Sequence, residues 1–96
     1  MIGMKPEDRN DRTGRLAFSL AGHDKGKVYI IVGEENGRYL LSDGRYKPLS
    51  APKKKKAKHF QIGPETDLTE LFGNGETVRD EDIRRTIKKA SFIQED

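Results

Sequence analysis

The fold of this chain is decided by the segment Gly14-Arg15-Leu16-Ala17-Phe18-Ser19-Leu20-Ala21-Gly22-His23-Asp24-Lys25-Gly26-Lys27-Val28-Tyr29-Ile30-Ile31-Val32. In its first third, Leu16, Phe18 and Leu20 fall on one face at a period of two, which predicts a half-buried strand. A turn containing two glycines follows at 21–26. The β-branched and aromatic run at 27–32 then predicts a second strand, covered on both faces for part of its length.

Turn signals divide the next residues into further short strands. Asn36-Gly37 and Asp43-Gly44 favour positive φ and suit tight hairpins, and Pro48 places the end of one strand at a sheet edge. Five short strands predict a small closed barrel, because closure removes open edges. The strands predicted after the first two are residues 38–42, 45–49 and 59–62. The predicted core residues are Leu16, Phe18, Leu20, Val28, Ile30, Val32, Leu40 and Ile62.

Beyond Pro64 the pattern becomes helical. A single helical turn is predicted at 67–72, and a helix at 80–90 on which Ile83, Ile87 and Ala90 form one apolar stripe. Acidic residues in the first turn of that helix and lysines in its last turn match the helix dipole. Since one amphipathic helix cannot stand alone, we expect it to lie against the barrel.

The chain has 96 residues, enough for one small domain with appendages. Residues 1–12 are charged and show no periodicity, which predicts a mobile N-terminal tail. The predicted barrel spans 13–63 and includes a basic connector at 50–58, and 64–96 form a helical C-terminal appendage. The absence of cysteine excludes disulfides and thiolate metal sites. No apolar run approaches the roughly 20 residues that span a bilayer, so we expect a cytoplasmic protein without membrane contact.

The charge is unevenly distributed along the chain. Residues 38–60 carry eight basic and one acidic side chain, for +7, whereas residues 65–96 carry five and nine, for −4. Five of the basic side chains are lysines between positions 53 and 58 that repel one another, and a polyphosphate backbone relieves this repulsion while releasing counterions. Such lysines contact phosphates without reading bases. A solvated loop and a nuclear import signal are the other interpretations of this run.

Other site chemistries find little support. The turn at 22–27 does not fit a nucleotide-binding P-loop, because three residues separate its glycines where four are needed and Val28 stands where Ser or Thr would hold magnesium. Neither His23 nor His59 has a partner at metal-ligand spacing. The acidic cluster at 80–82 is explained by helix capping. We therefore expect no metal, no cofactor, no small-molecule substrate and no catalytic residues: the chain is predicted not to be an enzyme.

The run from Gly14 to Ser42 resembles the KOW motif of ribosomal and transcription-associated RNA-binding proteins. Gly26 falls where that motif carries its central glycine. With the stretches 39–44 and 53–59 added, the chain is similar to the short bacterial KOW proteins, which in turn resemble a large-subunit ribosomal protein of archaea and eukaryotes. The resemblance covers residues 13–63. It implies an SH3-like five-stranded barrel that binds structured RNA, with ribosomal RNA as the expected target and the turn between the first two strands facing it.

The resulting hypothesis is an RNA-binding, ribosome-associated protein that contacts structured RNA through one basic face and the first barrel turn. Tyr46, between Arg45 and Lys47, is the best candidate to stack on an unpaired base. The alternative is a protein–protein interaction module of the transcription or translation machinery, in which ribosomal or transcription proteins are the partners and the acidic segment 65–96 engages a basic surface. The predicted RNA-binding residues are His23, Lys25, Gly26, Lys27, Arg38, Arg45, Lys47, Lys53, Lys54, Lys55, Lys56 and Lys58.

Overall fold

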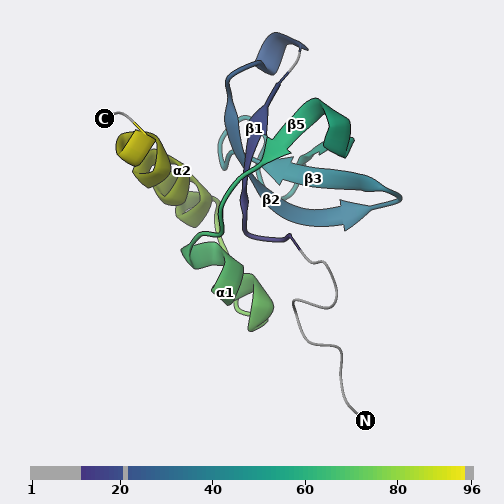
Figure 1. The fold of residues 1–96 in the computed structure, drawn as a ribbon. Helices are drawn as coiled ribbons and strands as arrows, with labels where there is room; N and C mark the ends of the chain where they lie inside the picture. Colours follow the sequence, from purple (N-terminus) through teal and green to yellow (C-terminus); the bar gives the residue numbers. More distant parts are fainter. Residues whose placement is uncertain (1–11, 21, 95–96) are drawn as a thin grey trace.

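Five short strands form one antiparallel sheet, and two α-helices lie together on one side of it (Figure 1). The structure is a computed structural model that describes residues 12–20 and 22–94, so the tail predicted at 1–12 lies outside the described residues apart from Arg12. The strand order is β4-β3-β2-β1-β5. A mainly β fold with a helical C-terminal part is thereby confirmed. The elements are β1 (Leu16–Ser19), η2 (Gly22–Asp24), β2 (Val28–Glu35), β3 (Arg38–Ser42), β4 (Lys53–Lys55), η3 (Ala57–His59), β5 (Phe60–Ile62), α1 (Asp67–Gly73) and α2 (Asp80–Gln94).

The hairpin predicted from the opening segment is present. Leu16 pairs with Ile30 and Phe18 with Val28 across β1 and β2. Gly22 and Gly26 adopt φ values of 80° and 90°, the left-handed region that favours glycine. The two glycines therefore let the chain reverse between these strands.

Both faces of this hairpin are buried. Leu16 and Ile30 pack against the helices, while Ala17, Tyr29 and Ile31 point into a second cluster on the other face. The predicted coverage of β2 on both faces is confirmed. β1, however, was predicted to be half-buried, and its second face is buried as well.

Some predicted core positions are therefore wrong. Leu20 is 50% exposed, because β1 ends at Ser19 before Leu20 can turn inward. Leu40 is half-buried, and its neighbour Leu41 is fully buried. The second cluster is completed by Leu41 of β3 and Phe60 of β5, which are distant from the β1–β2 hairpin in the sequence.

The strand predicted at 45–49 is not present, and the lysines of the predicted connector form β4 instead. The Asp43 carboxylate accepts hydrogen bonds from the backbone N–H groups of Arg45 and Lys47, both at 2.8 Å, which holds this segment as a loop. β4 pairs with β3, so that Lys53 lies opposite Leu41. Lysine can occupy such a strand because its aliphatic stem covers apolar surface while its ammonium group stays at the rim.

Both helices are attached to the β-sheet by hydrogen bonds and apolar contacts. The Thr66 hydroxyl accepts from the backbone N–H of Leu68 and donates to the carbonyl of Gly14, so the N-cap of α1 also binds the backbone that leads into β1. On α2, Ile83 is fully buried, and Ile87 and Ala90 pack at the edge of the same cluster. The predicted docking of this stripe is confirmed. No helix in the described part of the chain is long and apolar enough to cross a bilayer.

Candidate nucleic-acid interface

Two basic segments that are far apart in the sequence meet at the end of β1. The backbone N–H of Leu20 donates to the carbonyl of His59 at 3.0 Å, which ties η3 to the end of β1. The ammonium group of Lys55 donates to the Ser19 hydroxyl at 2.7 Å, and the Ser19 N–H donates to the carbonyl of Lys27 at 3.0 Å. The β1–β2 turn and the lysine cluster are thus joined through two consecutive residues.

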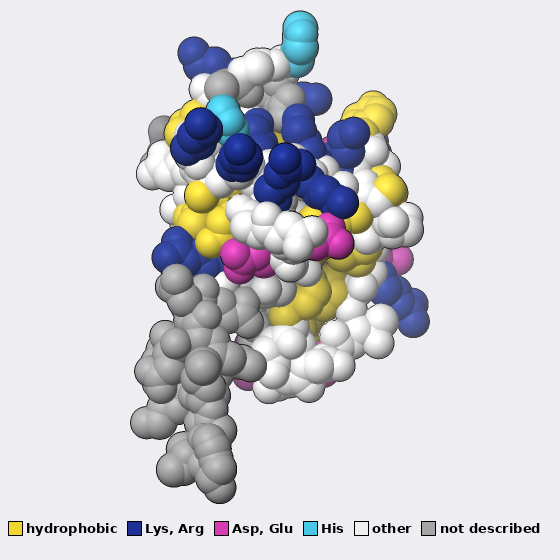
Figure 2. Space-filling model, turned by 90° about the vertical axis from the view of Figure 1, so that its right-hand side faces the viewer, with side chains coloured by type: hydrophobic (Ala, Val, Ile, Leu, Met, Phe, Trp, Pro, Cys, Tyr) yellow, Lys and Arg dark blue, Asp and Glu magenta, His cyan; other side chains and the backbone are white. Residues whose placement is uncertain are grey.

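Figure 2 shows the consequence on the surface. Lys and Arg side chains gather in a band across the upper part of this face, and both histidine side chains lie beside it. Side chains of Asp and Glu appear below the band. This face of the molecule therefore presents a concentrated positive field to solvent.

The β1–β2 turn contributes exposed cations on an open backbone. His23, Lys25 and Lys27 are all exposed. At Gly22 and Gly26, an added Cβ would meet no atom within 4 Å. The surroundings of both glycines are therefore open, and a ligand could approach the backbone closely there.

The five lysines of the cluster divide into two kinds. Lys53 and Lys55 are half-buried on β4 and make contacts within the protein, including the bond from Lys55 to Ser19. Lys54 is exposed and lies 3.0 Å from the Glu35 carboxylate, which compensates part of its charge. Lys56 and Lys58 are exposed. Together with His23, Lys25 and Lys27 of the β1–β2 turn, Lys56 and Lys58 form a surface that we call the basic end surface.

The other predicted contacts lie on different elements. Arg38 begins β3 at the β2–β3 turn, opposite Glu35. Arg45 lies in the loop after β3 and lines a hollow together with Arg84 and Lys88 of α2. Lys47 is exposed on the same loop. The structure therefore adds helix α2 to the surroundings of the predicted site.

Sequence reasoning missed Arg84 and Lys88. The sequence predicts Lys88 in the last turn of the helix, which is wrong because α2 continues to Gln94 and has no basic residue in its last turn. The KOW resemblance ends before α2. One signal was available: positions 84 and 88 are four residues apart and share a face of any helix that contains both.

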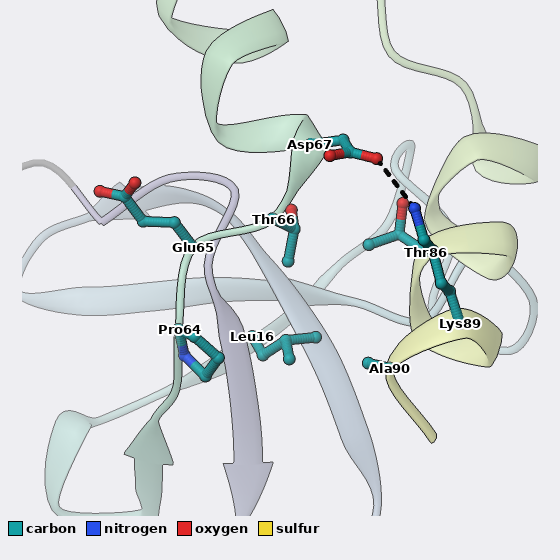
Figure 3. A pocket seen from close by; sticks show the side chains of 8 residues that line it. All are labelled: Leu16, Pro64, Glu65, Thr66, Asp67, Thr86, Lys89 and Ala90. Carbon is teal, nitrogen blue, oxygen red and sulfur yellow. Dashed lines mark hydrogen bonds and ion pairs between the residues drawn. The ribbon is translucent and has the colours of Figure 1, made fainter. Parts of the chain in front are cut away.

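A second hollow, of about 270 Å³, separates α2 from the segment that joins β5 to α1 (Figure 3). Leu16 and Ala90 form part of its apolar wall. Asp67 and Lys89 span it at 3.4 Å, while Glu65 points away from it. Since the one cation at its rim is already paired with a carboxylate, this hollow does not extend the basic surface.

The described residues hold no group of three His, Asp or Glu side chains placed to bind a metal ion. No protein-family model matches the sequence, and a search of curated proteins finds no match.

Proposed function

We propose that this chain binds structured RNA through the basic end surface. One observation carries the proposal: the hydrogen bonds at Ser19 and Leu20 join two separately basic segments, the turn at 22–27 and the segment 55–59, through Lys55 and His59. Exposed ammonium groups held on folded backbone attract phosphates and release counterions when they bind them.

The two segments make different contributions. Lys25 and Lys27 sit on a short turn fixed at both ends by strands, so their spacing is set before RNA arrives. Their contacts depend on where the phosphates of a folded RNA lie. Lys56 is the N-cap of η3 and Lys58 lies within it, and both add positive charge beside the β1–β2 turn. The proposed binding is therefore selective for RNA shape rather than for base sequence.

Within the same proposal, the sheet is an SH3-like barrel of the KOW type. Side chains from strands that are not neighbours in the sheet meet: the rings of Tyr39 on β3 and Phe60 on β5 stand edge to face with centroids 5.5 Å apart, and Lys55 on β4 reaches Ser19 on β1. Such contacts support strong curling of the sheet. Together with the KOW resemblance of residues 13–63, they support a ribosome-associated role in the cytoplasm.

The test measures affinity for an RNA hairpin and for a single strand of equal length at three salt concentrations. We expect the pair Lys25→Gln with Lys27→Gln to reduce the preference for the hairpin. We expect Lys56→Gln with Lys58→Gln to weaken both RNAs alike and to make the slope of log K against log salt shallower by about 0.7–0.9 for each phosphate that the variant no longer binds.

The matched control removes two cations from α2, Arg85→Gln with Lys89→Gln. Both side chains are exposed and already pair with carboxylates, so their loss should change RNA affinity little. If all three double variants lose the same affinity, net charge rather than the basic end surface drives binding, and the proposal is wrong. If an acidic protein surface binds where RNA does not, the chain is a protein-interaction module instead.

A further inference from the structure

The loop after β3 is held rigidly by the residues at its base. Asp43 accepts two backbone N–H bonds, and the Ser42 hydroxyl donates to the carbonyl of Lys47 at 2.7 Å while accepting from the N–H of Gly44. Ser42 is fully buried. The loop backbone between 43 and 47 therefore has a fixed shape.

The same loop is fastened to α2. The guanidinium of Arg84 donates to the carbonyl of Gly44 at 2.6 Å. Gly44 has a φ of 73°, and a Cβ built on it would lie 2.5 Å from the carbonyl oxygen of Asp80. Only glycine allows this approach, so loop and helix form one rigid wall around the hollow between them.

Tyr46 stands at the tip of this loop with 79% of its surface exposed. The other two tyrosines behave differently: Tyr29 is buried and Tyr39 packs against the core. Single exposed aromatic residues are common and need no explanation by themselves. Here, however, the ring projects from a rigid loop beside cations, which is the arrangement that binds an unpaired base.

The hollow beside Tyr46 has a volume of about 250 Å³ and is positively charged. Its wall contains three cations, Arg45, Arg84 and Lys88, and one carboxylate, Asp43, which leaves a balance of +2. The apolar side chain of Ile87 completes the wall. An aromatic ring, an apolar side chain and excess positive charge together match the base and the phosphate of a nucleotide.

We propose that the hollow between loop 43–47 and α2 is a nucleotide subsite, in which an unpaired RNA base stacks on Tyr46 while Arg45 and Lys88 bind the adjacent phosphates. This inference rests on the proposed RNA binding and adds a place where RNA is held by stacking, apart from the shape-dependent contacts of the basic end surface. Arg84 is a positioning residue, because its guanidinium holds the loop.

The first experiment uses a unique fluorescent probe. The chain has no tryptophan, so Tyr46→Trp gives a single reporter at the subsite. The probe RNA is a hairpin with a single-stranded extension, compared with the same RNA carrying abasic sites throughout the extension. We expect quenching by the first RNA and little quenching by the second. Equal quenching by both RNAs would overturn stacking at this position.

The second experiment measures affinity for the same two RNAs. We expect the wild-type chain to bind the extended hairpin about tenfold more tightly than its abasic form, the scale of one stacked base. Tyr46→Ala should abolish this preference and Tyr46→Phe should keep it. Because Tyr46 is exposed, the unfolding midpoint of both variants should match that of the wild type. A preference that survives Tyr46→Ala would overturn the proposal.

The phosphate contact has a matched control in the adjacent residue. Lys88 lines this hollow, whereas Lys89 reaches Asp67 across the other one (Figure 3). We expect Lys88→Gln to weaken binding of the extended hairpin and to make its salt dependence shallower, and Lys89→Gln to do neither. Equal effects of the two variants would overturn the role of Lys88. If the wild-type chain binds the hairpin without any preference for the extension, the subsite is wrong and the basic end surface stands; if it binds no RNA, both are wrong.

Discussion

At the scale of single residues, neighbouring lysines of one run perform different tasks. The ammonium group of Lys55 donates to the hydroxyl of Ser19, which is 3% exposed, whereas Lys56 is exposed beyond the end of β4. Hydrogen bonds that involve a charged group contribute about 1.5–3 kcal/mol. We therefore predict that Lys55→Gln lowers the free energy of unfolding by about 1–2 kcal/mol, and that Lys56→Gln leaves it nearly unchanged.

Urea denaturation of the two variants checks this prediction, and RNA affinity is measured on the same samples. Lys56→Gln should show the larger change in the salt dependence of RNA binding. Equal unfolding midpoints for both variants would mean that the bond from Lys55 to Ser19 contributes nothing to stability.

The sequence identifies the cationic residues, but it did not predict which of them are exposed. Period-two alternation identified Leu16, Phe18 and Ile30 on the helix-covered face, yet it gives no sign that Ala17 of β1 is buried as well. The reason is physical: the cover on each face comes from residues far away in the chain. Local periodicity describes one strand and does not contain that information.

At the scale of elements, the sheet separates two hydrophobic clusters, one completed by the helices and the other by β3 and β5. Ile83 of α2 packs with Leu16 and Ile30, whereas Ile31 belongs to the opposite cluster. We predict that Ile83→Val and Ile31→Val each lower the free energy of unfolding by about 0.5–1.5 kcal/mol. Since the two side chains share no cluster, the double variant should lose the sum to within about 0.5 kcal/mol.

Thermal or urea unfolding of the two single variants and the double variant gives the coupling energy. A coupling clearly above that limit would show that the two faces respond as one core. Ile87→Val is a useful control, because Ile87 is half-buried and should cost less than Ile83→Val.

The elements best predicted were those with a local cause. The hairpin at 14–32 depends on its glycines, and α2 depends on its apolar stripe, so both could be recognised from the sequence. The strand expected at 45–49 failed because Ser42 and Asp43 occupy its backbone groups with side-chain bonds. β4 was missed because pairing with β3, rather than any preference of lysine, makes that segment a strand.

At the scale of the whole molecule, the charge segregation visible in the sequence becomes a difference between surfaces. The basic residues of 55–59 and of the turn at 22–27 meet at the end of β1, while carboxylates predominate in 65–96. The sequence predicted that a polyanion would be attracted to the middle of the chain. It could not predict that Tyr46 and two cations of α2 would surround one hollow, because that arrangement depends on how loop 43–47 docks on the helix.

The distribution of charge predicts that salt weakens RNA binding without destabilising the fold. The ion pairs Lys54–Glu35, Arg85–Glu81 and Lys89–Asp67 are exposed and contribute little to stability, and screening also relieves repulsion among the lysines of 53–58. Raising KCl from about 50 mM to about 200 mM should therefore leave the unfolding midpoint unchanged or slightly higher. Over the same range, log K for RNA should fall against log salt with a slope of about −0.7 to −0.9 per bound phosphate.

Both quantities are measured in one titration series, with circular dichroism for unfolding and fluorescence anisotropy for binding. A parallel fall of stability and affinity would mean that salt weakens binding by unfolding the chain, and the electrostatic account of the basic end surface would then be wrong.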